Sequence, residues 1–176
     1  MKLYVARHGQ TVFNAADKIS GVTDVELTEQ GIEQARELAE KLVDKKIDII
    51  ISSPMKRAVK TANIIAERCK IGVVIDKRLI EQNYGIYEGM SPKTPEFLSN
   101  KRNFAYRYPG GESMMQVAAR TYPLIDEVKE KYKGKNVLFL CHGGTCRVIH
   151  TYFHDMTNDE FFEFKRGNCA ITEYNL

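Results

Sequence analysis

Apolar and polar positions alternate along this chain in a pattern that predicts strands and helices in turn. Short apolar runs at 2–6, 47–52, 73–75 and 136–141 predict strands, and 170–175 alternates like an edge strand. Apolar residues recur at helical spacing over 28–45, 55–69, 113–132, 144–154 and 158–162. Thr28 is the expected N-cap of the first of these helices, and Pro123 predicts a kink or a break inside 113–132.

This order of elements predicts an α/β fold, a three-layer α/β/α sandwich with a mostly parallel central sheet. Nearly continuous apolar strands are typical of sheets that helices cover on both faces. No linker, repeat or low-complexity segment divides the chain, so we expect one domain over 1–176. The pattern breaks over 84–111, where Pro92, Pro95 and Pro109 predict an irregular excursion with one short helix near 96–102. We expect this excursion to lie over the site.

Composition, net charge and the first residues narrow the classes of protein to which this chain can belong. The 176 residues are 43% hydrophobic and 28% charged, which is the balance of an ordinary globular domain. A formal charge of +3 is too small to predict binding to nucleic acid or to a membrane. The first residues lack the pattern of a signal peptide, so a cytoplasmic protein is expected. The sequence leaves the oligomeric state open.

Charged residues follow each predicted strand of the parallel sheet. Ligands in open α/β sheets bind beyond the carboxyl ends of the strands, so these residues are expected to converge. Arg7 and His8 follow the first strand, Arg57 the second, Glu81 the third and His142 the fourth.

These residue types suit the transfer of a phosphoryl group from a phosphate ester. Arginine forks match phosphate oxygens, and a neutral histidine can attack phosphorus. The other histidine, if protonated, adds a positive charge. A glutamate can protonate the leaving oxygen if desolvation and a neighbouring phosphate raise its pKa. No cluster of carboxylates is positioned to hold Mg²⁺, so the arginines are expected to neutralise the phosphate.

At these residues the sequence resembles the histidine phosphatase superfamily, with its phosphoglycerate-mutase-like fold, over essentially the whole chain. The matching blocks are Arg7-His8-Gly9-Gln10-Thr11 with Asn14, Ser20-Gly21, Leu27 to Ala35, Ser52 to Ala62, Pro109 to Ser113 and His142-Gly143-Gly144. The resemblance implies that His8 is the phosphorylated nucleophile and that Arg7, Arg57 and His142 form the phosphate pocket. It implies that Glu81 is the general acid and then the base for water. No metal and no cofactor are expected.

Two further blocks, 106–113 and 141–147, resemble the fructose-2,6-bisphosphatase branch. That branch grips a second phosphate with a tyrosine, an arginine and a lysine, and this chain has Pro92, Ser99 and Asn103 at those positions. Only the arginine at Arg147 survives from that set, and Lys101, Arg102 and Arg107 are nearby cations that could substitute. The candidate substrate-binding residues are Asn14, Ser20, Gly21, Tyr84, Gly143, Arg102, Arg107 and Arg147.

The combined prediction is a metal-independent phosphomonoesterase that hydrolyses a small phosphorylated metabolite through a phosphohistidine. The alternatives are a cofactor-dependent phosphoglycerate mutase, a sugar bisphosphatase, and a non-catalytic scaffold that binds a phosphorylated ligand. The chain ends just after its last predicted strand, without the tail that closes over the site in the mutase branch. Because an open site admits water, hydrolysis is expected.

Two side-chain pairs have competing interpretations. His150 and His154 have the i, i+4 spacing of metal ligands, but no third ligand is evident, so packing or surface roles are expected. Cys141 and Cys146 flank His142 and could form a redox pair, although reduced thiols are expected in a chain without an export signal.

Overall fold

The structure is a computed structural model that describes residues 1–176. Its strands are β1 (Lys2–Arg7), β2 (Ile49–Ser52), β3 (Gly72–Ile75), β4 (Val137–Cys141) and β5 (Ile171–Asn175). Its helices are α1 (Val12–Ala15), α2 (Glu29–Leu42), α3 (Lys56–Cys69), α4 (Pro95–Lys101), α5 (Met114–Lys131), α6 (Gly143–Phe153) and α7 (Asn158–Glu163). Short 3₁₀ turns lie at Val43–Lys45, Lys77–Leu79 and Gly85–Tyr87.

The strands form one sheet in the order β3-β2-β4-β1-β5, parallel except for β5, which runs antiparallel to β1. The register pairs Arg7 at the end of β1 with Cys141 at the end of β4. It also pairs Ser52 at the end of β2 with Leu140. The residues that follow these three strands therefore leave the sheet side by side at one edge.

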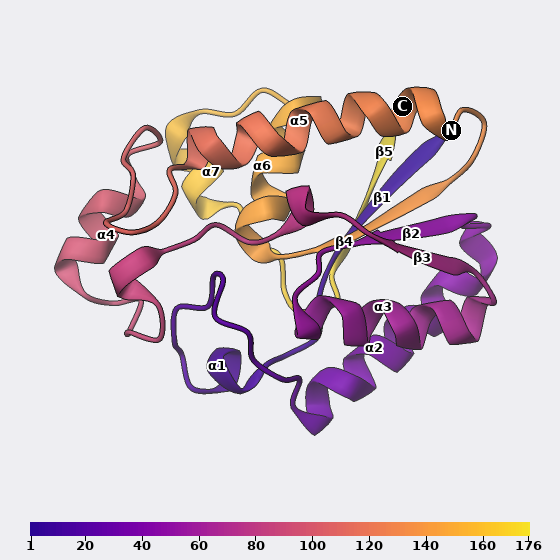
Figure 1. Cartoon of the computed structure of the whole chain (residues 1–176), viewed down its shortest axis with the longest axis horizontal. Coiled ribbons are helices and arrows are strands. Elements are labelled where there is room, and N and C mark those ends of the chain that lie inside the picture. The colour runs from indigo at the N-terminus through magenta and orange to yellow at the C-terminus, as the bar shows by residue number, and fades with distance from the viewer.

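Helices cover both faces of the sheet, as Figure 1 shows, with α5 and α6 on one side and α2 and α3 on the other. The alternation of side chains along β1 explains this arrangement. Leu3 and Val5 pack in the core under α5 and α6, whereas Tyr4 and Ala6 pack under α2 and α3. The predicted three-layer α/β/α sandwich is confirmed.

Two local features differ from the sequence expectation. The short helix α1 was not expected, and a capping box between Thr11 and Asn14 stabilises its start. The helix α5 continues through Pro123 without a break. Pro123 is exposed, and Leu124, Ile125 and Val128 just beyond it are fully buried against the sheet. Their burial offsets the backbone hydrogen bond that the proline removes.

The excursion over 84–111 packs Tyr87, Phe97 and Tyr108 into a small apolar cluster with Ile19 from the segment after α1. Its two ends meet at Gly85, where a Cβ atom would lie 1.9 Å from the carbonyl oxygen of Pro109. Gly85 also has a φ of +55°, which glycine adopts without strain.

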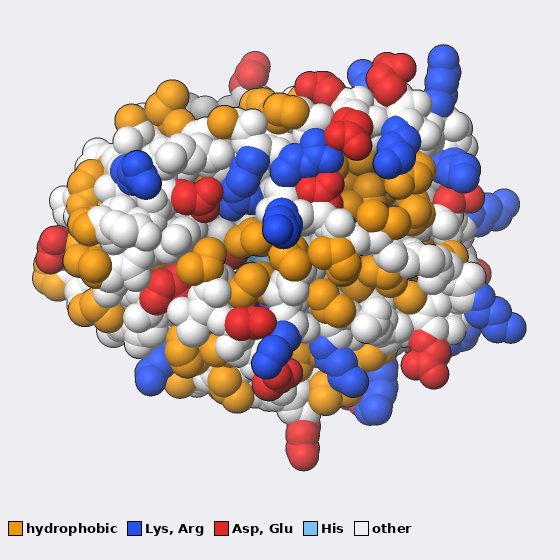
Figure 2. Space-filling view, in the orientation of Figure 1, with side chains coloured by type: hydrophobic (Ala, Val, Ile, Leu, Met, Phe, Trp, Pro, Cys, Tyr) orange, Lys and Arg blue, Asp and Glu red, His pale blue; other side chains and the backbone are white.

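The distribution of charge on the surface and the polarity of the helices agree with the composition of an ordinary globular domain. Basic and acidic side chains are interspersed over the face drawn in Figure 2. None of the helices is both long enough and apolar enough to cross a bilayer.

Candidate active site

The two candidate catalytic histidines lie together where β1 and β4 end. The backbone N–H of His8 donates to the carbonyl of Cys141 over 3.1 Å, which continues the ladder past the strands. The ring centroids of His8 and His142 are 5.1 Å apart. The parallel register therefore brings together two residues that are far apart in the sequence.

One ring nitrogen of His8 makes a hydrogen bond within the protein, and the other makes none. Its Nδ1 lies 2.7 Å from the carbonyl oxygen of Gly9. Because a carbonyl only accepts, Nδ1 carries the proton and Nε2 keeps its lone pair. Burial, and then the charges of Arg7 and Arg57, hold the pKa of His8 well below its usual range. His8 is therefore a neutral imidazole with an unprotonated Nε2, which is the form that a nucleophile requires.

His142 is also neutral, which corrects the expectation that it adds a positive charge. The Nε of Arg57 donates to Nδ1 of His142 over 3.2 Å, so this nitrogen carries no proton. The Nε2–H of His142 then faces the Oγ of Ser53 at 2.7 Å. Burial, and then the charge of Arg57, hold the pKa of His142 well below its usual range. The positive charge of this part of the site comes from the arginines.

Arg57 is fully buried at the start of α3, and its guanidinium group donates three hydrogen bonds. Besides its bond to His142, it donates from Nη1 to the carbonyl of Thr23 (2.9 Å) and from Nη2 to the carbonyl of Gly21 (2.5 Å). Gly21 thus positions Arg57 through its backbone. A Cβ atom on Gly21 would lie 2.2 Å from the carbonyl oxygen of Gln82, so only glycine fits there.

Glu81 accepts hydrogen bonds from the first turn of α6. Gly144 N–H donates to Oε2 over 2.8 Å, and Thr145 N–H donates to Oε1 over 3.0 Å. Gln82 N–H adds a third bond to Oε1 at 2.9 Å. The positive end of the helix dipole also faces this carboxyl group. Gly144 permits the contact, because a Cβ atom there would lie 2.6 Å from Oε1 of Glu81.

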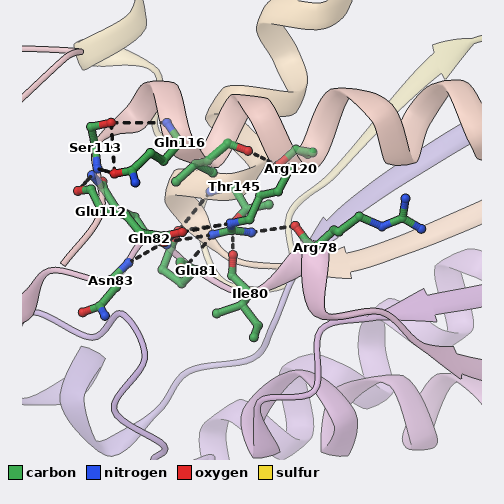
Figure 3. Close-up of polar contacts among 12 residues, drawn as sticks. Arg78, Ile80, Glu81, Gln82, Asn83, Glu112, Ser113, Gln116, Arg120 and Thr145 are labelled. Carbon is green, nitrogen blue, oxygen red and sulfur yellow. Dashed lines mark hydrogen bonds and ion pairs between the residues drawn. The ribbon is translucent and has the colours of Figure 1, made fainter. Parts of the chain in front are cut away.

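A second group of polar contacts fixes the backbone on either side of Glu81 (Figure 3). Arg120 on α5 donates from Nη1 to the carbonyl of Arg78 (2.6 Å) and from Nη2 to the carbonyl of Glu81 (3.2 Å). Glu112 pairs with Arg120 at 3.3 Å and accepts from the N–H of Asn83 at 3.1 Å. The segment 78–83 is therefore tied to the start of α5 as well as to α6.

Beside these groups lies a cavity of about 270 Å³. The predicted site residues that line it are Arg7, Asn14, Ser20, Glu81, Tyr84, Gly143 and Arg147. The Nε of Arg7 and the Oγ of Ser20 are buried and have no hydrogen-bond partner, so both can serve a ligand. His8, Arg57 and His142 do not line the cavity, and each is at least 97% buried. His8 directly follows Arg7 and His142 directly precedes Gly143, and both Arg7 and Gly143 belong to the cavity wall.

Comparison with known proteins identifies the family. The model of the histidine phosphatase superfamily, branch 1, matches residues 3–176. The chain belongs to the histidine phosphatase superfamily. Phosphoglycerate mutase-like protein 4 of Arabidopsis thaliana is 35% identical over 159 residues, which are 85% of this chain and 69% of that protein.

Solved structures of this superfamily share the fold. A mycobacterial glucosyl-3-phosphoglycerate phosphatase has a TM-score of 0.90 and 29% identity, over 98% of this chain and 90% of that chain. The phosphoserine phosphatase of Entamoeba histolytica, solved with 3-phosphoglyceric acid, has a TM-score of 0.84 and 30% identity, over 98% and 88% of the two chains.

Two of the predicted substrate-binding arginines lie outside the cavity of this histidine phosphatase. The exposed side chain of Arg102 pairs with Asp159 at 3.0 Å. Arg107 donates from Nε to the carbonyl of Gly111 over 3.0 Å and borders a different cavity. Lys101, next to Arg102, lines the cavity instead, because neighbouring positions on α4 face different directions.

Sequence reasoning missed several lining residues, namely Lys18, Ile19, Phe97, Gly144, Phe164, Lys165 and Arg166. One signal was available for Lys165 and Arg166. They precede β5, and because β5 is antiparallel to β1, its first residues lie at the edge where β1 ends. The carbonyl of Arg166 accepts from Nη1 of Arg7 over 2.7 Å, which confirms that closeness.

Of the two side-chain pairs with competing interpretations, Cys141 and Cys146 are buried, His150 is half-buried and His154 is exposed. His150 lies 2.8 Å from the hydroxyl of Tyr174 and stacks on Phe164, and no group of three or more potential metal-binding side chains forms. Cys141 and Cys146 are buried free thiols whose Sγ atoms are 3.4 Å apart.

Proposed function

We propose that this chain is a phosphatase that hydrolyses a small phosphate monoester through a covalent phosphohistidine on His8, without a metal ion. The observation that carries the proposal is the state of His8. Its Nδ1 proton is committed to Gly9, so Nε2 is the nitrogen left to attack, and two arginines neighbour it.

In the first step Arg7 and Arg57 neutralise the phosphoryl oxygens as negative charge builds up on them. Nε2 of His8 forms a bond to phosphorus while the bond from phosphorus to the ester oxygen breaks. Glu81 gives its proton to the departing oxygen. The closeness of Glu81 to the cavity supports this role, since it is the one carboxyl group in the lining.

In the second step a water molecule attacks the phosphohistidine. Glu81 takes a proton from the water, the bond between phosphorus and Nε2 breaks, and inorganic phosphate leaves. The Arg57 guanidinium must stay oriented through both steps. His142 serves this purpose as a positioning residue, because its Nδ1 holds Arg57 Nε.

The names of the related proteins agree with a small substrate. They include a glucosyl-3-phosphoglycerate phosphatase and a phosphoserine phosphatase. We therefore take a small phosphorylated metabolite as the substrate of this chain. A cavity of about 270 Å³ fits a compound of that size.

Release of inorganic phosphate from p-nitrophenyl phosphate tests the proposal. The wild-type protein should release phosphate, and His8→Ala should lose this activity. His154→Ala is the matched control, because His154 is an exposed histidine outside the cavity. An active His8→Ala variant would refute the assignment. Interconversion of phosphoglycerates without release of phosphate would instead identify a mutase.

A further inference from the structure

The side chain of Asn168 joins two parts of the active site without itself lining the cavity. Asn168 lies in the turn before β5, and its Nδ2 donates to the backbone carbonyl of His8 over 3.0 Å and to Oδ1 of Asn14 over 3.2 Å. Asn14 lines the cavity, whereas Asn168 does not. Asn168 therefore contacts a residue that can bind the substrate, but it has no contact of its own with a ligand in the cavity.

The backbone on both sides of Asn168 is fixed to the end of β1. The N–H of Ala170 donates to the carbonyl of Gly167 over 3.1 Å and closes the turn. The N–H of Cys169 donates to the carbonyl of Arg7 over 3.1 Å, and the N–H of Arg7 donates to the carbonyl of Ala170 over 3.2 Å. Cys169 has a φ of +56°, which is uncommon for a residue other than glycine. Such conformations persist where the surrounding structure fixes them, and they are frequent at functional sites.

Backbone partners decide which way the two amide groups point. The N–H of Thr11 donates to Oδ1 of Asn14 over 3.1 Å, and because a backbone N–H only donates, the oxygen of Asn14 faces Thr11. The carbonyl of His8 only accepts, so the nitrogen of Asn168 faces His8. In these orientations the second N–H of Asn168 meets the oxygen of Asn14, so a donor faces an acceptor.

The end of Asn14 that has no partner in the protein is its amide nitrogen. Oδ1 of Asn14 accepts from both Thr11 and Asn168, and Nδ2 of Asn14 donates to no protein group. In the same cavity wall, Nε of Arg7 also lacks a partner. An amide nitrogen donates hydrogen bonds to phosphoryl oxygens, whereas an amide oxygen only accepts and repels them. The direction of the Asn14 amide group therefore decides whether Asn14 attracts or repels a phosphoryl group.

We infer that Asn168 is a positioning residue, which holds the amide nitrogen of Asn14 toward the phosphoryl group in the cavity. The inference rests on the proposed function and adds a residue to it. Without Asn168, one hydrogen bond from Thr11 is left to orient the Asn14 amide, and the last side-chain torsion of asparagine has a broad, roughly twofold preference. The amide oxygen then turns toward the phosphoryl group in a fraction of the molecules. Because negative charge builds up on the phosphoryl oxygens during transfer, the loss should appear in kcat more than in KM.

A double-mutant cycle with Asn14 tests this inference. Asn168→Leu removes the two donors at a similar side-chain size. Asn14→Asp keeps an acceptor for Thr11 and loses the donors toward the cavity, and since its two carboxylate oxygens are equivalent, the direction of the group no longer matters. Asn168→Leu should lower kcat for p-nitrophenyl phosphate about tenfold in the wild-type protein and less than about twofold in Asn14→Asp. An equal loss in both backgrounds, or no loss in the wild-type protein, would overturn the inference.

The cycle separates Asn14 from the other partner of Asn168. If Asn168 acted only through the carbonyl of His8 or through the stability of the turn, its loss would cost the same in the wild-type protein and in Asn14→Asp. Asn175→Leu is the matched control, because Asn175 is an exposed asparagine on β5 outside the cavity. It should keep the wild-type kcat and KM. Asn168→Ala is the second variant, and it should give the same pattern if urea unfolding shows that Asn168→Leu does not fold.

The Asn14 amide group also provides a readout that needs no turnover. In ¹⁵N-labelled protein, inorganic phosphate should shift the side-chain N–H signals of Asn14, which are identified by their absence in Asn14→Asp, and should leave those of Asn175 unchanged. In Asn168→Leu the Kd for phosphate from the same titration should rise about threefold. If no ester is hydrolysed, the proposed function fails, and this titration still decides the role of Asn168. Unshifted Asn14 signals, or equal Kd values for the wild-type protein and Asn168→Leu, would overturn the inference.

Discussion

The two glycines that open α6 allow a matched test of how Glu81 is positioned. Gly143 and Gly144 are the first two residues of the helix, so replacing either by alanine should give a similar gain in helix propensity of about 1 kcal/mol. Their surroundings differ. A Cβ atom on Gly143 would lie 3.6 Å from Nε of Arg7, which is an ordinary contact, whereas one on Gly144 would lie 2.6 Å from Oε1 of Glu81.

The size of the effect follows from these distances. To restore an ordinary contact of 3.4 Å, the Glu81 carboxyl group must move by about 0.8 Å in Gly144→Ala. A displacement of about 1 Å in a catalytic group can lower the rate by about 10²-fold. That shift also strains the hydrogen bonds from Gly144 and Thr145. We therefore expect a loss of about 10²-fold in kcat for an alkyl phosphate.

The assay compares two leaving groups. An alkoxide needs a proton from Glu81, but p-nitrophenolate leaves well without one. Gly144→Ala should therefore lower kcat for the alkyl phosphate much more than for p-nitrophenyl phosphate, and Gly143→Ala should keep the wild-type ratio. Because Glu81 also activates water in the second step, the ratio is measured in the burst of the first turnover, which reports the first step alone. A Gly144→Ala variant that kept the wild-type ratio there would refute the role of Glu81 as the leaving-group acid.

Three further predictions follow from the contacts around the site. Arg120→Met removes two hydrogen bonds to the backbone of 78–81. It should lower kcat for alkyl phosphates about tenfold and the free energy of unfolding by about 1.5–3 kcal/mol. Unchanged kinetics and an unchanged midpoint of urea unfolding would contradict this prediction. Activity should persist in EDTA and be inhibited by vanadate, a mimic of five-coordinate phosphorus, whereas strict dependence on Mg²⁺ or Zn²⁺ would refute the mechanism. Burial holds the pKa of His8 and of His142 well below 6.5, so the unfolded chain binds more protons than the folded protein at acidic pH. The free energy of unfolding should therefore fall as the pH drops below about 6.5, by up to about 1.4 kcal/mol per pH unit for each histidine. Urea unfolding at pH 7 and at pH 5.5 should show a smaller fall for His8→Ala than for the wild-type protein.

The sequence was sufficient to predict the sheet and the residues at its strand ends. Apolar runs identify parallel strands, and the strand-end rule then places His8, His142 and Glu81 near one edge. The neutral state of His142 was not predictable in this way. It depends on a hydrogen bond from Arg57, 85 positions away in the sequence, which exists only once β2 and β4 pair.

The residues on the substrate side of the site were harder to predict, because the direction of each side chain decides whether it lines the cavity. Lys101 and Arg102 are adjacent cations, and only the direction each takes at the end of α4 decides which one lines the cavity. Lys165 was missed because the strand-end rule applies to parallel strands, whereas the residues at the start of the antiparallel β5 reach the same edge.

The most direct test of the account is to trap the covalent intermediate. The protein is mixed briefly with a ³²P-labelled phosphate ester, quenched in alkali and mapped by mass spectrometry. The account predicts one phosphoryl group on Nε2 of His8, stable in base and lost in acid, and no label in His8→Ala. Label that survives acid, label on another residue, or undiminished label in His8→Ala would contradict it.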